Sequence, residues 1–235
     1  MLHGQVAVDG LSVVTQAGGA ADACISSLGG LSLDQLRWIF SSYSSDEMQA
    51  TGWSPAAIPN SDGDDSTHLW SELSEGCPAV EIKIAGPDSE SGTYEYMSET
   101  IFPALDDDEI FDSSRPDSYF NSASDEDIIM YLEENADAIA YFGYAYYVEN
   151  QDVLSAAAIE NEDGDFVAPE AASVGDGSYN PLARRIYMNL LNDEAALTLT
   201  APFINFGLGP AGAVLVSQTG YVPVPEPNMV TMISK

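Results

Sequence analysis

Basic side chains are scarce in this chain. Its 235 residues include six Lys and Arg against 38 Asp and Glu, which gives a formal net charge of −32 at pH 7. Proteins that bind nucleic acid neutralise its phosphates with Lys and Arg. The charge balance therefore nearly excludes nucleic acid as a partner. A densely acidic surface repels other copies of itself and keeps a protein soluble.

Long apolar runs are also missing. No stretch approaches the roughly 18 consecutive apolar residues that a membrane-spanning helix needs. Residues 1–10 have neither the basic start nor the apolar centre of a secretory signal peptide. A mature chain has the same appearance, so this absence does not place the protein in the cytoplasm. Hydrophobic residues make up 45% of the chain, which is enough for an ordinary buried core.

Residues that bind metals are few and poorly spaced. The two cysteines, Cys24 and Cys77, form no CxxC motif and have no metal-ligand spacing with His3 or His68. Two free thiols and one disulfide are both compatible with the sequence. We prefer the disulfide, which suits an extracytoplasmic protein.

Two acidic loops raise the question of calcium binding. They contain Asp62, Asp64 and Asp65 in one case and residues 106–109 in the other. Neither loop has the ligand order, central Gly and terminal Glu of an EF-hand. We therefore interpret both as solvated loops on an acidic surface and expect no metal site.

The hydrophobic pattern predicts strands that alternate with helices, which indicates an α/β fold. Between residues 161 and 165 the sequence NEDGD predicts a hairpin turn. Trp53 is expected to be a buried anchor in a polar loop region, 43–65. The expected strands are 9–16, 79–85, 138–146 and 184–191, and the expected helices are 33–40, 93–102, 125–135, 194–208 and 211–219.

The most informative segment is 84–97, IAGPDSESGTYEYM. A strand ends in a Gly-Pro turn, and Ser91, Gly92 and Thr93 open a helix. The first turn of a helix carries unpaired N–H groups and a partial positive charge, which stabilise an anion. Gly92 permits close approach, and the two hydroxyls add donors. The pattern suits a tetrahedral oxyanion, although Ser91 can equally be a plain N-cap.

Further segments give the chain a specific resemblance. It resembles the PstS-type phosphate-binding proteins, the ligand-carrying components of phosphate ABC transporters. The matching segments occur in the family's order: DGLSVVT (9–15), LSLDQLRWIF (31–40), IAGPDSESGTYEYMSETI (84–101), SSRPDSYFNSASDED (113–127), IAYFGYAYY (139–147), YNPLARRIYMNL (179–190) and GLGPAGAVLVSQTGYVPVP (207–225).

The resemblance implies a type II periplasmic-binding-protein fold, in which two α/β lobes enclose phosphate. It assigns phosphate contacts to Ser91, Gly92 and Thr93. Arg115 matches the family's Arg-containing stretch, and a bidentate Arg–phosphate contact gives the physical reason for an Arg. The alternative for Arg115 is a surface ion pair with its acidic neighbours.

The resemblance also implies a division of the chain. Residues 1–15 form a hinge-crossing strand, 16–182 the α/β lobe with the phosphate loop, and 183–235 a return strand with helices that belong to the first lobe. Most of that first lobe has no counterpart here. We therefore expect a missing N-terminal lobe or a partner chain to complete the cleft, and an exposed apolar face on helices 194–219.

The implied function is capture of inorganic phosphate and its delivery to an ABC transporter permease in the periplasm or outside the cell. No cofactor and no catalysis are expected. A phosphatase would need a nucleophile with a base or a metal cluster, and Ser91 has no His partner in the sequence. The second alternative is a PstS-like scaffold or sensor that has lost or altered its ligand.

Overall fold

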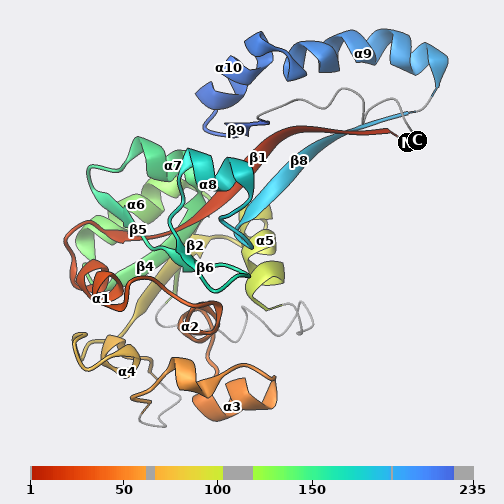
Figure 1. Ribbon diagram of the computed structural model, residues 1–235. Coiled ribbons are helices and arrows are strands. Elements are labelled where there is room, and N and C mark those ends of the chain that lie inside the picture. Colours follow the sequence, from red (N-terminus) through yellow and green to blue (C-terminus); the bar gives the residue numbers. More distant parts are fainter. Residues whose placement is uncertain (1, 62–66, 103–118, 192, 225–235) are drawn as a thin grey trace.

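The computed structural model describes residues 2–61, 67–102, 119–191 and 193–224 (Figure 1). A seven-stranded mixed sheet has the order β3-β2-β4-β1-β5, and β8 and β9 also pair with β1. The strands of this sheet are β1 (Leu2–Gln16), β2 (Lys83–Pro87), β3 (Tyr119–Ser122), β4 (Ala138–Gly143), β5 (Leu154–Ala156), β8 (Ala183–Leu190) and β9 (Val222–Pro223). A second sheet pairs β6 (Ile159–Glu160) with β7 (Phe166–Val167).

Helices alternate with these strands and confirm the α/β class. They are α1 (Ala20–Leu28), α2 (Leu33–Ile39), α3 (Ser45–Ala50), α4 (Trp70–Leu73), α5 (Gly92–Ile101), α6 (Asp125–Glu134), α7 (Tyr144–Glu149), α8 (Ala171–Asp176), α9 (Glu194–Leu208) and α10 (Pro210–Gln218), with a 3-10 turn at Pro55–Ala57. No single helix of the described part is long and apolar enough to cross a membrane. Residues 200–208 and 210–218 meet that measure only as a pair bent by 70°.

The long strand β1 belongs to two parts of the molecule. Its second half, 11–16, pairs antiparallel with β4 and β5 inside the α/β body, which we call the lobe. Its first half, 2–10, pairs antiparallel with β8. This two-stranded ribbon leaves the lobe and carries α9 and α10 (Figure 1). We call the ribbon, β9, α9 and α10 the arm.

Alternating side chains on the central strands build cores on both faces of the lobe sheet. Val13, Ile139 and Tyr141 face a large core that helices α1, α2, α4 and α5 share. Val14, Ala140 and Phe142 face a second core under α6. Five consecutive residues of β4 are buried, as expected for a strand covered on both sides.

The expected strand 138–146 is wrong in its second half. Strand β4 ends at Gly143, and Tyr144 begins helix α7. The side chain of Phe142 is the last fully buried one in this run. Beyond it the chain turns onto the surface, where Asn150 closes the helix by donating its side-chain amide to the Tyr146 carbonyl at 2.8 Å. Aromatic residues favour strands, which explains the prediction. Those after Gly143 have no neighbouring strand to pair with among the described residues, so they form helix α7 instead.

Three other expectations need correction. The expected strand 9–16 is only part of β1, which already begins at Leu2 and pairs with β8 over residues 2–10. Strand 79–85 begins only at Lys83, because Glu81 forms a single isolated bridge to Leu69. The region 43–65 was expected to be a loop, but it contains helix α3. Ser44 and Glu47 form the capping box at the N-terminus of this helix. Trp53 is buried there as expected. The remaining expected helices and the strand 184–191 agree with the structure within about two residues at each end.

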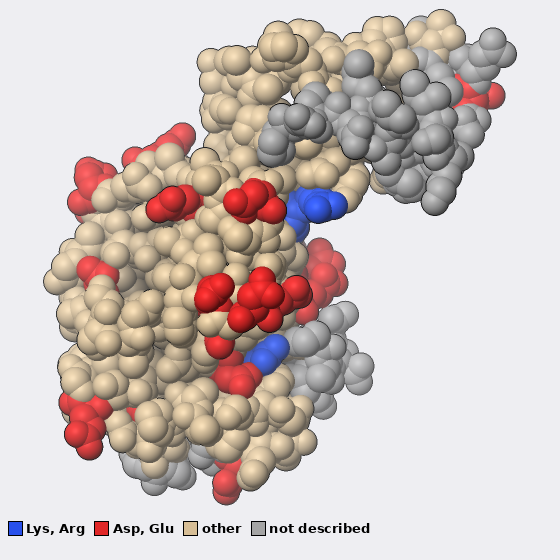
Figure 2. Space-filling view, viewed as in Figure 1, with Lys and Arg blue, Asp and Glu red and all other residues tan. Residues whose placement is uncertain are grey.

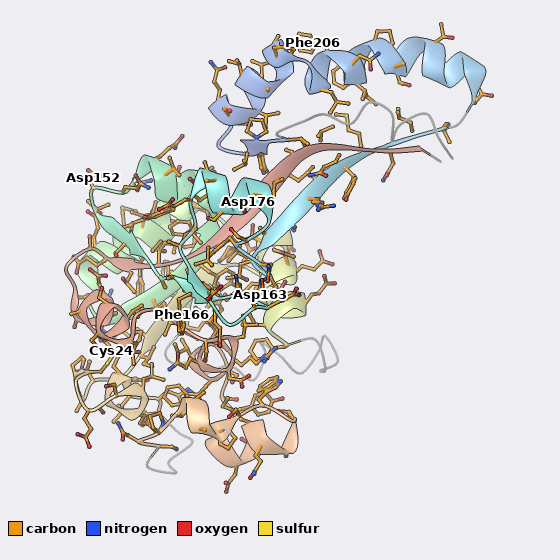
Figure 3. The ribbon with its side chains drawn as sticks, viewed as in Figure 1. Cys24, Asp152, Asp163, Phe166, Asp176 and Phe206 are labelled. Carbon is orange, nitrogen blue, oxygen red and sulfur yellow. A yellow bond between two sulfur atoms is a disulfide. The ribbon has the colours of Figure 1, made fainter. Side chains whose placement is uncertain are left out.

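Cys24 and Cys77 are joined by a disulfide, with their Cα atoms 4.8 Å apart (Cys24 is labelled in Figure 3). The bond ties α1 to the segment after α4. The NEDGD turn connects β6 and β7 as a hairpin. Arg115 and the acidic loops with Asp62, Asp64, Asp65 and residues 106–109 lie outside the described residues. Within the described part, no three His, Cys, Asp or Glu side chains are placed to hold a metal.

Candidate functional site

The first turn of α5 lies directly after a buried strand. Strand β2 is packed so closely on Tyr141 that a Cβ on Gly86 would lie 2.6 Å from its ring. The hydroxyl of Tyr119 donates to the Pro87 carbonyl at 2.9 Å. Burial raises the pKa of Tyr119 to about 12, so the phenol stays a donor at neutral pH. The end of β2 is thereby fixed, and with it the start of the loop to α5.

Ser91 acts as the N-cap of α5. Its hydroxyl oxygen accepts a hydrogen bond from the Thr93 amide at 3.1 Å, and its carbonyl accepts from the Glu95 amide at 3.1 Å. The plain N-cap interpretation of Ser91 therefore applies in this structure. The hydroxyl proton of Ser91 remains available to an acceptor.

Gly92 leaves the start of α5 open. It is exposed, and a Cβ built on it would meet nothing within 4 Å. The Gly92 amide has no hydrogen-bond partner among the described residues. An unpaired amide at the positive end of a helix is a donor for an anion.

A cleft of about 330 Å³ lies between the lobe and the arm. Thr93 reaches it from α5, Asp9 from β1 and Arg184 from β8. The lobe side is completed from the start of α6 and from α7, and the arm side from the end of α10. The lining residues are Asp9, Thr93, Asp125, Gly143, Ala145, Tyr146, Glu149, Arg184, Gln218, Thr219 and Tyr221.

Arg184 connects the ribbon to the first turn of α5. Asp9 and Arg184 are direct cross-strand neighbours in the β1–β8 ribbon. The Nε and Nη2 atoms of Arg184 each lie 3.2 Å from Asp9 Oδ2. Its Nη1 donates to the Gly92 carbonyl at 3.2 Å, and its guanidinium lies 4.7 Å from the centre of the Tyr96 ring. Tyr96 in turn donates to the Pro181 carbonyl at 2.6 Å.

Among the described residues that line this cleft, acidic groups outnumber bases. Burial raises the pKa of Asp9, and the Arg184 guanidinium lowers it in part. Burial also raises the pKa of Asp125, with a further increase from Glu126. Glu149 adds a third carboxyl group. Figure 2 shows acidic side chains scattered over the lobe and few basic ones on the same face.

The motif at residues 91–93 predicted one wall of this cleft, and the opposite wall was not predicted. Thr93 lines the cleft, while Ser91 and Gly92 stand beside it as the cap and the first helical residue. Asp9 and Arg184 were not among the candidate residues. Both residues nevertheless lie in segments that match the family. Asp9 begins DGLSVVT, and Arg184 lies near the start of the return strand in YNPLARRIYMNL. Without the pairing of β1 and β8, nothing connected them to α5.

Comparisons with known proteins agree on one group. The chain is 31% identical over 172 residues to Protein SphX of Synechococcus elongatus, covering 72% of this chain and 48% of that protein. A solved structure described as a possible phosphate binding protein from Planctomyces limnophilus is 30% identical, with a TM-score of 0.67 over 95% of this chain and 67% of that one. The chain belongs to the PstS-type family of phosphate-binding proteins.

Other relatives of this PstS-type chain are more distant. A phosphate-binding protein PstS from Staphylococcus haemolyticus is 29% identical over 160 residues, which cover 67% of this chain and 46% of that protein. An ABC-type phosphate transport receptor from Vibrio cholerae has a TM-score of 0.61 at 18% identity, over 94% of this chain and 71% of that one, and shares the fold. No family model matches. The chain thus has the type II periplasmic-binding-protein fold and spans about half the length of the curated relatives it matches.

Proposed function

We propose that this PstS-type chain binds inorganic phosphate at the first turn of α5, without catalysis. The anion would accept hydrogen bonds from the Gly92 amide and from the hydroxyl groups of Thr93 and Ser91. The single observation that carries the proposal is the open cleft at this turn, where Gly92 is exposed and its amide is unpaired among the described residues. A helix N-terminus stabilises an anion without a formal cation, which suits a chain of such negative charge.

Two of the similar proteins support a biological role. One is a phosphate-binding protein PstS, and another is an ABC-type phosphate transport receptor. We infer that the whole protein delivers phosphate to an ABC transporter permease from an extracytoplasmic location. Arg115 stays a proposed phosphate contact, since it lies outside the described residues.

We further propose that residues 16–182 act as one ligand-binding lobe, and that residues 1–15 and 183–235 connect it to a second one. The arm presents apolar side chains to solvent, among them Phe203, 65% exposed, and Phe206, 51% exposed. Phe206 lies on α9 outside the lobe (Figure 3). Residues 195–224 contain no Asp, Glu, Lys or Arg. An uncharged apolar face of this kind suits burial against another lobe or a partner chain.

The test is a thermal unfolding series with phosphate, with sulfate and with sodium chloride at matched ionic strength. Phosphate is expected to raise the melting temperature of the wild-type chain beyond the chloride control. Thr93→Ala should reduce that increase, since it removes one hydroxyl donor from the cleft. Arg115→Gln tests the sequence-based contact in the same series.

A scaffold or sensor that no longer binds phosphate is the second candidate. The observation that favours it is the presence of three carboxyl groups, Asp9, Asp125 and Glu149, around one cleft. Like charges near an anion oppose its binding. Equal melting temperatures in phosphate and chloride, for the wild type and for Thr93→Ala, would select this candidate.

A further inference from the structure

Arg184 is the described base that faces the proposed anion site. The other bases of the described part point elsewhere. Arg37 pairs with Asp34 at 2.6 Å, Lys83 pairs with Asp137 at 3.2 Å, and Arg185 is exposed on the ribbon without lining the cleft. Among the bases that the structure describes, only Arg184 lines the cleft together with Thr93.

The contacts of Arg184 leave part of its guanidinium unused. A guanidinium has five N–H groups in a planar fork. The contacts to Asp9 and to the Gly92 carbonyl use three of them. Two N–H groups therefore remain without a partner among the residues that the structure describes. The side chain is 36% exposed, so solvent or a ligand can reach them.

Asp9 holds this guanidinium in place. The Asp9 side chain is only 17% exposed, and its Oδ2 atom is engaged by both Nε and Nη2. The ring of Tyr96 supports the flat face of the guanidinium. The group is thus fixed beside the first turn of α5 before any anion arrives, which lowers the entropic cost of binding.

We propose that Arg184 is the cation that holds the oxyanion against the first turn of α5, with Asp9 as the residue that positions it. This inference rests on the proposed function and adds to it a charged ligand from the ribbon. An anion held in this way contacts the lobe through α5 and the arm through β8. Binding would then fix the lobe relative to the ribbon that carries α9 and α10.

The experiment compares Arg184→Gln with Arg185→Gln. Both variants remove one positive charge from adjacent residues of β8, so the overall charge of the chain changes equally. Titration of inorganic phosphate at constant ionic strength, followed by the ¹⁵N–¹H signal of the Gly92 amide, gives the affinity of each variant. We expect Arg184→Gln to weaken binding about tenfold or more, as for loss of a charge-assisted contact. Arg185→Gln should stay within about threefold of the wild type, since exposed charges act weakly through water.

Arg184→Lys tests whether weaker binding comes from loss of the guanidinium or from a folding defect. Lysine keeps a positive charge opposite Asp9, but it lacks the fork that reaches Asp9, the Gly92 carbonyl and an anion together. We expect a folded variant, as judged by its melting temperature, with an affinity between those of the wild type and Arg184→Gln. Full affinity in Arg184→Lys would contradict the need for a guanidinium.

The outcomes separate this inference from the proposed function. If the wild type and Arg185→Gln bind phosphate and Arg184→Gln binds equally well, the role of Arg184 is refuted and phosphate binding stands. If the wild type shows no saturable change at the Gly92 amide, the proposed function fails and takes the role of Arg184 with it. Loss of binding in Arg184→Gln alone supports both.

Discussion

Gly92→Ala is expected to stabilise the unliganded chain and to weaken phosphate binding. An added Cβ would meet nothing within 4 Å, and Gly92 does not have a positive φ. Alanine therefore fits the structure and reduces the conformational freedom of the unfolded chain. The expected gain is about 0.5 kcal/mol in the free energy of unfolding. For a chain of this size that corresponds to a melting temperature roughly 1–2 °C higher.

The same methyl group would occupy the space from which an anion approaches the Gly92 amide. Loss of one hydrogen bond to a charged group costs about 1.5–3 kcal/mol. The affinity for phosphate should consequently fall about tenfold to a hundredfold. The two effects have opposite signs, so a general loss of structure cannot imitate them.

The assay combines thermal unfolding without ligand and isothermal titration with phosphate. Gly207→Ala is the matched control, since Gly207 also lies in a helix and its added Cβ also meets nothing within 4 Å. It should stabilise the chain and leave the affinity unchanged. If Gly92→Ala binds phosphate as tightly as the wild type, the anion does not lie against the first turn of α5, and the reasoning is refuted.

Three further predictions concern the disulfide, the cleft and the arm. Replacing Cys24 and Cys77 by Ala removes a link across 53 residues, which lowers the free energy of unfolding by about 4 kcal/mol in urea unfolding. Asp125→Asn should stabilise the chain at pH 7 by about 1 kcal/mol or less and leave its stability unchanged near pH 3, because the folded-state pKa is raised above 3.8 and the cost of ionisation exists only above it. Phe206→Ser should reduce concentration-dependent association in sedimentation velocity, because it removes an exposed aromatic ring from the arm.

Each of these three has a control and a result that contradicts it. Reduction of the wild type with dithiothreitol should match the Cys-to-Ala variant, and unchanged stability in both would contradict a structural role for the bond. Glu126→Gln removes a neighbouring acid that does not line the cleft, and an equal gain there would show a general charge effect. Phe166→Ser removes a ring that is 47% exposed on the lobe, and equal effects of both Phe variants would remove the arm from the explanation.

Local signals explain why α5 could be predicted to within a residue. Gly86 and Pro87, expected as a turn, are the last two residues of β2, Ser91 caps the helix, and no helix breaker follows until Pro103. The strand 138–146 failed for the opposite reason. Its aromatic residues favour a strand, but the chain leaves the sheet after Gly143, and only this tertiary packing decides where β4 ends.

The basic side of the cleft could not be predicted from local sequence. Arg184 lies 92 residues from Gly92, and their contact depends on the pairing of β8 with β1. The disulfide was easier to predict, because the chain has two cysteines and they can pair only with each other. The distance of 4.8 Å between their Cα atoms shows that they meet. Thr93 was identified because its neighbours form one continuous motif.

The central claim is that inorganic phosphate binds at the first turn of α5. A ¹⁵N–¹H correlation spectrum of the labelled 235-residue chain, recorded during titration with phosphate at constant ionic strength, tests it most directly. The account predicts saturable changes at the Gly92 and Thr93 amides and at the Arg184 Nε–H signal. Saturable changes confined to other residues, or identical spectra in phosphate and chloride, would contradict it.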